Sequence, residues 1–477
     1  MEIGTQKQLL LDEFIVEDTW NLRRAVVQPA KYPANPLMVC DRPWEEFNIP
    51  ELRGGGPIIT SAVLCDEAEG LFKMWYILCR MVYWKGLYDK EYTYWTCYAT
   101  SPDGRRWEKP ELGIVEFEGS RKNNILLQGQ WWATCGTVLK EPAEPDPARR
   151  YKMLYTDILG KQQVGEHRWT GGESGVCIAY SPDGIHWTPY SGNPVMGGES
   201  DTMNTVFWDE RLGKYVWYLR PRVYAGYWKR RIARAESADL IHWSFPETVL
   251  VPDELDTIEV YGMPVFVHEG VYFGLLQMYD SDKNENITVQ LAFSRDGKKW
   301  ERLPTRDLFL ALGGRGETGR DFDSGMVFAA PPVRVGDELW FYYSGWQGTH
   351  KGWENESAIG LATSKTDRLI GRRTEVGKEG ALLTRSFRCE GDGLEVNVSC
   401  ANGWIIAEVL GLEGEAIPGY DRGSCLPFSG DAIRQRLGWK EGRTLGQLRG
   451  QEIRLKFYLR NAELYAFQVR DSTERNR

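Results

Sequence analysis

The chain has 477 residues, with 58 Lys and Arg against 67 Asp and Glu, which gives a net charge of -9 at pH 7. Such a chain lacks the basic excess that nucleic acid or an anionic membrane requires, so we expect a neutral ligand and neither of these partners. It has no run of 18 apolar residues and no basic, apolar signal near Met1, so we expect a cytoplasmic protein, or a secreted one if a leader was removed.

Residues 1–56 begin with a strand-like run from Leu9 to Val16, and a Pro-rich segment follows from Gln28 to Glu45. This segment is too long to be only a linker. We therefore expect residues 1–56 to form an N-terminal strand and a wrapping segment that belong to the repeated structure after them.

A short phrase then recurs along the chain: Ser-x-Asp-Gly, with a Trp three residues behind the Gly. The copies begin at Ser101, Ser181, Ser237, Ser294 and Ser364, and the fifth has lost its Trp. Asp and Gly in this order are turn residues, so each copy predicts a tight hairpin between two strands. Recurrence at roughly 56 to 80 residues predicts a propeller, with the Trp packed between neighbouring blades.

Each interval repeats one plan of apolar strand, short turn, apolar-aromatic strand, variable loop and hairpin. We therefore predict an all-β protein with a five-bladed β-propeller over residues 57–377. After about Gly377 the phrase stops, and short alternating runs are broken by Gly, Asp and Asn. This pattern predicts a β-sandwich, jelly-roll-like, over residues 378–477.

The loops of such a blade divide between two faces. The start of strand one and the loop between strands two and three share one face, and the hairpin between strands three and four lies on the other. Here the hairpins are uniform, whereas the loops between strands two and three are long and irregular, so we predict that the loop-bearing face is the functional one.

Three acidic residues fall at the starts of first strands, where the blades converge on the axis: Asp201, Glu259 and Asp323. Like charges brought together raise one another's pKa, and glycoside hydrolysis needs one protonated and one ionised carboxyl group. We predict a catalytic cluster of these three. The alternative for each is a turn-capping role.

Other residues on the same face are candidates for substrate binding. Arginines there suit pairing with the carboxylates or binding of hydroxyls, and aromatic rings suit stacking on a sugar. The predicted set is Arg53, Trp131, Trp132, Arg220, Arg222, Tyr261, Arg320, Asp321 and His350. His350 is also a candidate ligand of a central ion, and Asp321 has the alternative of pairing with Arg320.

The nine cysteines contain no Cys-x-x-Cys pair, and no two histidines have metal-ligand spacing. We expect reduced, mostly buried thiols rather than a disulfide framework or a zinc site. The predicted chemistry requires no cofactor. A structural calcium or other ion on the propeller axis is compatible with this prediction.

The chain resembles the five-bladed propeller glycosidases, the family 32 and 43-like superfamily of glycosyl hydrolases. The resemblance rests on Ser181-Pro182-Asp183-Gly184, on the segment Asp201 to Asp209, and on Phe322-Asp323-Ser324-Gly325-Met326. It implies the propeller, the sandwich that frequently follows it, and activity on a carbohydrate. The hairpin phrase also resembles the Asp-box of sialidases, which indicates fold and not substrate.

Enzymes of that superfamily carry the nucleophile or base on blade one, a stabilising Asp on blade two and the acid Glu on blade three. Here the acidic residues fall on blades three, four and five. On this basis Glu259 is the expected acid, Asp201 the base or nucleophile, and Asp323 the orienting group.

Three functions follow from these residues. The first is a glycoside hydrolase that cleaves a neutral oligosaccharide or small glycoside. The second is an inverting glycoside phosphorylase with an Arg and His phosphate site. The third is a carbohydrate-binding propeller without turnover. The sequence leaves the oligomeric state and the stereochemical outcome open.

Overall fold

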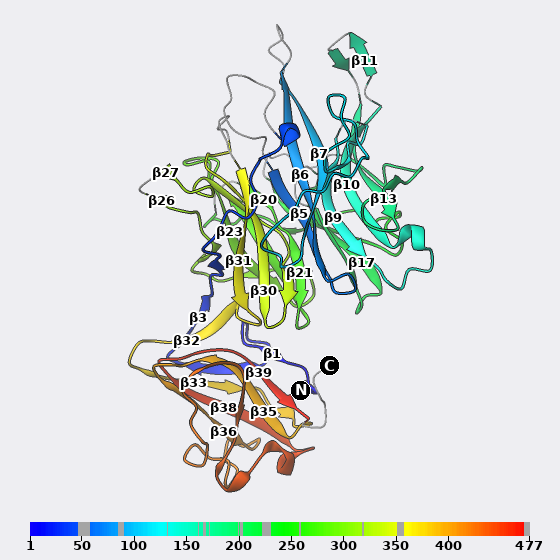
Figure 1. The fold of residues 1–477 in the computed structure, drawn as a ribbon. Helices are drawn as coiled ribbons and strands as arrows, with labels where there is room; N and C mark the ends of the chain where they lie inside the picture. The colour runs from blue at the N-terminus through cyan, green and yellow to red at the C-terminus, as the bar shows by residue number, and fades with distance from the viewer. Residues whose placement is uncertain are drawn as a thin grey trace.

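The computed structural model describes residues 1–45, 58–83, 90–130, 132–160, 162–165, 168–170, 172–198, 200, 204–221, 230–256, 259–316, 319–350 and 357–471. Strands and a few short 3₁₀ turns make up the regular structure of these residues, which confirms the all-β prediction. Figure 1 shows two stacked bodies, a larger one above and a smaller one below, with both chain termini at the smaller body. In the described residues no helix is long and apolar enough to cross a membrane.

Within the described residues the larger body contains three antiparallel sheets of four or five strands and one 11-stranded sheet that includes a single parallel pair. Dividing the 11-stranded sheet at that pair gives units of the predicted plan, which we call blades one to five. Blade one is β5 (Ile58–Asp66), β6 (Leu71–Tyr83), β7 (Lys90–Ser101) and β8 (Ile125–Leu127). Blade two is β9 (Thr134–Lys140), β10 (Tyr151–Leu159) and β13 (Glu173–Ser181), with β14 (Thr188–Pro189) and β15 (Met196–Gly197) outside; β11 (Gln162–Gly165) and β12 (Arg168–Thr170) form a separate hairpin in its loop.

Blade three is β16 (Thr205–Asp209), β17 (Lys214–Leu219), β18 (Ile232–Ser237) and β19 (Glu247–Leu250). Blade four is β20 (Glu259–Gly262) and β21 (Val265–His268), then β22 (Val271–Tyr279) and β23 (Ile287–Ser294), with β24 (Glu301–Arg302) and β25 (Leu308–Leu310) outside. Blade five is β28 (Met326–Ala329) and β29 (Val333–Val335), then β30 (Glu338–Trp346) and β31 (Ser357–Lys365); β26 (Arg315–Gly316) and β27 (Gly319–Arg320) pair before it. First-strand residues of blades one to four, and the turn residues Pro331 and Pro332 of blade five, line one cavity, which places the blades around a common axis.

The outer strand of blade five comes from the other end of the chain. Strand β4 (Ala30–Lys31) pairs antiparallel with β31, and the chain that leaves β31 passes instead into β32 (Ile370–Thr374) of the smaller body. Because no hairpin returns to this blade, the fifth copy of the phrase has no fourth strand to carry a packing Trp. This explains why the fifth copy is incomplete.

The remaining copies of the phrase form the predicted turns. In the second, Asp183 Oδ1 accepts hydrogen bonds from the backbone N–H groups of Ile185 and His186, both at 2.8 Å, and Gly184 has φ +80°. In the third copy Leu240 takes the positive φ, +67°, where the other copies have Gly. The predicted packing of the Trp is also seen, because the ring of Trp107 in blade one lies 5.6 Å from that of Tyr342 in blade five.

Successive blades are joined by a second contact that repeats, which we call the tyrosine clamp. A Tyr at or near the start of a second strand donates its hydroxyl to a carboxylate at the end of the preceding blade's first strand. The three pairs are Tyr151 with Asp66 at 3.0 Å, Tyr215 with Glu141 at 2.7 Å, and Tyr272 with Asp209. The clamps lie on the face of the turns between strands one and two, opposite the loop-bearing face.

The smaller body is a sandwich of two sheets. One sheet has the order β3 (Leu22–Val26), β32, β39 (Glu463–Arg470), β35 (Gly393–Ser399) and β37 (Asp431–Leu437), with β1 (Gln8–Leu9) on β39. The other has β2 (Val16–Trp20), β33 (Glu379–Thr384), β38 (Glu452–Arg460) and β34 (Phe387–Arg388), with β36 (Trp404–Leu410) on β38.

The domain boundaries differ from our expectation at the N-terminus. Residues 1–56 were expected to belong to the propeller, but β1, β2 and β3 pair with sandwich strands. The Pro-rich part does bind the propeller, through β4 and through a bridge of Met38 with Ile359. Strand β32 also lies in the sandwich, although it falls inside the range 57–377. The reason is physical: the apolar side chains of Leu10, Ile15 and Val16 are buried in the sandwich core.

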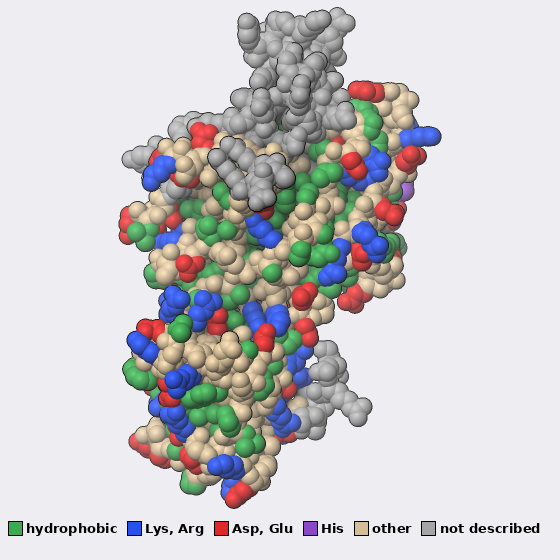
Figure 2. Space-filling model, turned by 60° about the vertical axis from the view of Figure 1, so that its left-hand side comes forward, with side chains coloured by type: hydrophobic (Ala, Val, Ile, Leu, Met, Phe, Trp, Pro, Cys, Tyr) green, Lys and Arg blue, Asp and Glu red, His purple; other side chains and the backbone are tan. Residues whose placement is uncertain are grey.

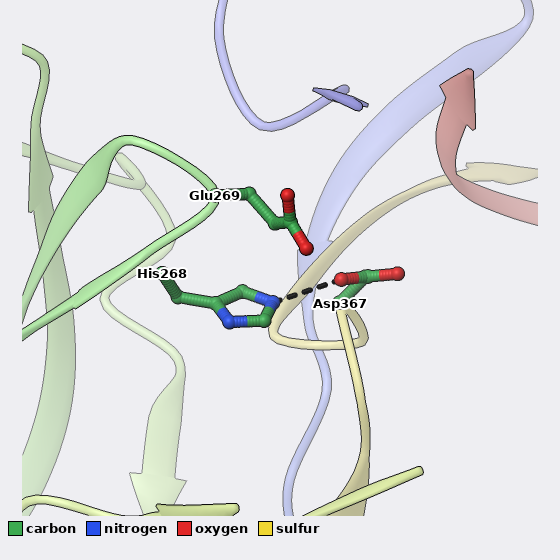
Figure 3. A group of neighbouring side chains, drawn as sticks. All are labelled: His268, Glu269 and Asp367. Carbon is green, nitrogen blue, oxygen red and sulfur yellow. Dashed lines mark hydrogen bonds and ion pairs between the residues drawn. The ribbon is translucent and has the colours of Figure 1, made fainter. Parts of the chain in front are cut away.

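The two bodies meet through an ion-pair network around Asp367, in the incomplete fifth copy of the phrase. His268 Nε2 lies 2.8 Å from Asp367 Oδ1, and Lys7 Nζ lies 2.9 Å from Asp367 Oδ2 and 3.1 Å from Glu269 Oε1. Figure 3 shows the His268 ring directed at the Asp367 carboxylate. Asn397 of the sandwich also donates to Asp367, at 3.2 Å.

Other contacts of the same kind surround this network. Arg295 of blade four binds Asp12 through two nitrogens, at 2.8 and 2.9 Å, and Arg434 binds Asp337 at 2.7 Å. Figure 2 shows basic and acidic side chains side by side at the waist between the two bodies. An apolar cluster that includes Leu9, Phe266 and Phe341 also spans the junction. We therefore expect the two bodies to be held firmly together.

We predict that Asp367→Asn lowers the free energy of unfolding at pH 7 by roughly 2 to 4 kcal/mol, since it leaves Lys7 and His268 without a buried anion. Burial raises the pKa of Asp367, but the hydrogen bond with His268 and the charge of Lys7 lower it further, to about 2 from 3.8. The stabilisation is therefore complete above about pH 4 and is lost as the pH falls towards about 2.

Urea unfolding followed by circular dichroism, at several pH values, measures this difference. The gap between wild type and Asp367→Asn should close between about pH 4 and pH 2. Asp282→Asn, on an exposed loop, is the matched control and should change stability by less than about 0.5 kcal/mol. A gap that is absent at pH 7, or that does not narrow at low pH, contradicts the prediction.

Candidate functional site

The predicted functional face carries the starts of the first strands and the loops between strands two and three. Four of the predicted site residues, Arg53, Trp131, Asp201 and Arg222, lie outside the described residues. For Arg320 only the backbone is described, in β27. The site is therefore built from the remaining predicted residues and their neighbours.

Glu259 stands at the start of blade four in an ion pair with Arg230, a residue that precedes β18 of blade three. Tyr279 of β22 lies directly opposite Glu259, and Tyr261 falls at an irregularity in the pairing of β20 with β22. The guanidinium of Arg230 lies 5.2 Å from the centre of the Tyr261 ring and 5.7 Å from that of Tyr279. The carboxylate thus sits beside a cation that is itself stacked on aromatic rings.

Arg220 approaches the same tyrosine from the end of β17. Its side chain is buried; Nη2 donates to the backbone oxygen of Tyr261 at 2.5 Å, and the guanidinium carbon lies 4.9 Å from the ring centre. Its backbone N–H donates to Ser200 Oγ at 3.3 Å. Arg220 therefore ties the start of blade four to the segment that begins blade three.

Ser200 and Asn204 stand on either side of Asp201 in the sequence. Ser200 Oγ donates to Asn204 Oδ1 at 2.7 Å, and Asn204 Nδ2 donates back to the backbone oxygen of Ser200 at 2.9 Å. Both residues are buried. The two ends of this short segment are thus held together next to Arg220.

His350, on the loop after β30, completes the group around Tyr261. Its Nε2 lies 3.2 Å from the Tyr261 hydroxyl, and its ring lies 4.6 Å from that of Tyr279. Its backbone N–H donates to the oxygen of Glu285 at 3.0 Å, which joins the loops of blades four and five. Burial, then the charges of Arg230 and Arg220, lower the pKa of His350 below 6.5. The imidazole is accordingly neutral at pH 7.

Asp323 has a different environment, although it also stands before a first strand. Its buried carboxylate accepts hydrogen bonds from Lys31 Nζ at 2.6 Å and from the Tyr343 hydroxyl at 2.9 Å. Burial and the neighbouring Asp323 charge raise the pKa of Tyr343 far above its usual range, so the hydroxyl remains a donor. Since Lys31 belongs to β4, this carboxylate helps to fix the strand that closes blade five.

The other two described candidates make backbone contacts. Asp321 Oδ2 accepts from the backbone N–H of Gly314 at 2.8 Å. The backbone N–H of Trp132 donates to Asp157 at 2.8 Å, and its ring packs edge-on against Tyr94 with 5.3 Å between ring centres. The structure thus gathers Glu259, Tyr261, Arg220 and His350 in one group.

Three neighbours of these residues were not predicted. Arg230 and Tyr279 belong to the Glu259 group, and Asp157 binds the backbone N–H groups of Gln130, Trp132 and Ile158. Arg230 lies in a loop that the sequence placed on the functional face, so the cations of that loop were a usable signal. Asp157 lies where the corresponding loop of blade two was expected to begin, but its contacts with backbone N–H groups form only after the strands pair.

One further group of side chains has the residue types and the spacing of a metal site. Within the described residues, the acidic and histidine side chains close enough to share an ion are His268, Glu269 and Asp367. The ammonium of Lys7 already contacts both carboxylates, so this group is satisfied as an ion-pair network. Seven of the nine cysteines are buried, and all nine are free thiols. An ion on the propeller axis stays a prediction.

No protein-family model matches the chain, and no curated protein sequence matches it. Solved structures do resemble it. A putative glycosidase from Bacteroides thetaiotaomicron is 16% identical, with 70% of this chain and 96% of that chain covered and a TM-score of 0.46.

A β-1,2-mannobiose phosphorylase from Listeria innocua is 15% identical, with 72% and 99% covered and a TM-score of 0.44. A fructofuranosidase from Schwanniomyces occidentalis in complex with fructosylnystose is 12% identical, with 93% and 98% covered and a TM-score of 0.42. Likeness at this level assigns no activity to the chain.

We predict that Arg230→Met raises the pKa of His350 towards 6.5, because it removes a nearby positive charge that disfavours the imidazolium. Glu259→Gln should lower it further, because the Glu259 charge acts in the opposite direction. The imidazole carbon-bound protons of the five histidines, followed by NMR against pH, give the measurement.

Arg211→Met is the matched control, since Arg211 stacks on Tyr272 beside the clamp of the opposite face. It should leave the His350 titration where it is in wild type. Equal titration in wild type and Arg230→Met would show that the described geometry around His350 is wrong.

Proposed function

We propose that the protein is a glycoside hydrolase whose active site is the group around Glu259 on the loop-bearing face. The observation that carries this proposal is a carboxylate beside aromatic rings at the start of a blade, with Arg220 linking it to the segment that contains Asp201. Aromatic faces suit the apolar face of a sugar, and a carboxylate pair is the minimum for cleavage of a glycosidic bond. The substrate is a neutral oligosaccharide or small glycoside.

The ion pair bears on the role of Glu259. A general acid must direct its carboxyl group at the leaving oxygen of the substrate, whereas the Glu259 carboxylate is directed at the guanidinium of Arg230. This supports Glu259 as base, nucleophile or acceptor of a sugar hydroxyl rather than as the acid expected from the sequence. Asp201 then becomes the candidate acid.

The contacts of Asp323 fit a structural role better than a catalytic one. Its Oδ2 atom is held by Lys31 and Tyr343, and both of these partners belong to blade five or its closing strand. Its role as the orienting group stays a prediction.

A second candidate function has its own observation. Arg220, Arg230 and His350 converge on Tyr261, and two guanidinium groups with an imidazole are side chains suited to bind phosphate. A glycoside phosphorylase would use phosphate at this place instead of water. Addition of inorganic phosphate to the assay separates the two functions.

We predict that Glu259→Gln reduces turnover by roughly 10²- to 10⁴-fold, the usual contribution of a positioned acid or base. The measurement is product formation from a panel of oligosaccharides and aryl glycosides, with and without inorganic phosphate. Hydrolysis without phosphate supports the hydrolase, and a sugar phosphate formed only with phosphate supports the phosphorylase.

Glu254→Gln, on an exposed loop of blade three, is the matched control and should keep wild-type turnover. Sugar binding without turnover in wild type would favour the carbohydrate-binding propeller instead. Full activity of Glu259→Gln would remove Glu259 from the chemistry.

A further inference from the structure

The propeller contains a cavity of about 520 Å³ that the candidate active site does not use. Each blade contributes to its wall, through Val63, Val138, Val206, Val265 and Pro331 respectively. A volume of this size lies within the range of pockets that hold small molecules, roughly 300 to 1,000 Å³.

The wall of the cavity runs along the first strands, from Gly136 and Thr205 near their starts, and its mouth lies at the end of the axis opposite to Glu259. Its wall extends to the ends of first strands, at Asp209 and Val267, and to the turn residues Arg211 and Gly270 that follow them. Glu259 and Ser200, by contrast, stand where first strands begin. Because each first strand crosses the propeller from one face to the other, the mouth of the cavity and the Glu259 group belong to opposite faces, and none of Glu259, Tyr261 and His350 lines the cavity.

The charges at the cavity wall are confined to Asp209, Glu210 and Arg211 at the turn of blade three, where Glu210 is exposed to solvent and Asp209 and Arg211 lie beside each other. Asp209 accepts the clamp hydrogen bond from Tyr272, and Arg211 Nε lies 3.6 Å from Asp209. Arg211 also stacks on the Tyr272 ring, 4.8 Å from its centre. A wall of this composition favours an uncharged occupant over an ionic one.

The mouth of the cavity exposes apolar side chains that are held in place. Trp208 is 45% exposed and Val267 is 41% exposed. The Trp208 ring is fixed edge-on against Tyr215, with 4.9 Å between ring centres. Exposed apolar surface around a preformed cavity gains free energy when an apolar molecule covers it.

The wall is also preformed, because neighbouring blades bind one another there. Thr137 donates its hydroxyl to the backbone oxygen of Asn204 at 2.6 Å and accepts from the backbone N–H of Val206 at 3.1 Å. A rigid wall reduces the ordering cost that binding would otherwise incur.

We propose that this cavity is a second binding site, for an uncharged small molecule with an aromatic or aliphatic body. It is separate from the Glu259 group and does not depend on the glycosidase proposal. Its occupant enters from the face of the tyrosine clamps, past Trp208 and Val267.

The test uses the intact protein and the neutral fluorescent probe N-phenyl-1-naphthylamine. Wild type should give saturable enhancement of probe fluorescence with one site per chain. Val267→Trp narrows the mouth and should weaken binding at least 10-fold. Val267→Asp adds charge without bulk and should weaken it as well, so one variant remains informative if the other fails to fold.

Val376→Trp, at a 96% exposed position in the sandwich, is the matched control and should bind the probe as wild type does. Non-saturable binding to wild type, or equal binding by all variants, overturns the proposal. So does displacement of the probe by a simple methyl glycoside, which would make the cavity a sugar subsite. The probe experiment measures no carbohydrate turnover. It therefore tests the cavity proposal independently of the Glu259→Gln assay, which tests the proposed function.

Discussion

The tyrosine clamp is the contact on which the arrangement of the blades depends. A buried hydroxyl that loses its acceptor costs roughly 1 to 3 kcal/mol, so each clamp fixes the position of one blade's second strand against its neighbour. The second strands need such a constraint because they are buried on both faces. All nine residues of β22, for example, are buried. Apolar packing alone would hold these strands together but would not fix their positions along the propeller axis.

The clamp is replaced where blade four meets blade five. His268 occupies the end of the first strand of blade four, the place of Asp66 or Asp209 in earlier blades, and its partner is Asp367. Between blades five and one, the Tyr342 hydroxyl donates to the backbone oxygen of Gly104 at 2.7 Å. Asp367, the partner of His268, also binds Lys7 of the N-terminal segment, so the contact at this place joins the propeller to the sandwich.

The repeated phrase made most of the propeller predictable, because its Asp and Gly act on backbone groups only two or three residues away. The N-terminal pairings could not be read in the same way. Strands β1 to β3 pair with partners more than 300 residues further along the chain, and nothing local to Val16 or Leu22 distinguishes a propeller strand from a sandwich strand.

The candidate site was likewise predictable only in part. The starts of first strands were expected to converge, and Glu259, Tyr261 and His350 do lie together. The pairing of each cation with a carboxylate depends on how side chains from different blades are oriented, and this orientation is not encoded in any local pattern. The sequence placed arginines on the same face as the carboxylates, but it did not identify Arg230 as the partner of Glu259 or Lys31 as the partner of Asp323.

The course of the first thirty residues has a consequence for synthesis on the ribosome. Strand β4 is made early but has no partner until β31 emerges, and β1 waits for β39 near the C-terminus. The sandwich therefore cannot be completed before β39 is made, whereas the strands of blade five are all made once β31 has been synthesised. The blades can form in order as they emerge, with blade five closed by the waiting β4, and the sandwich assembles after them.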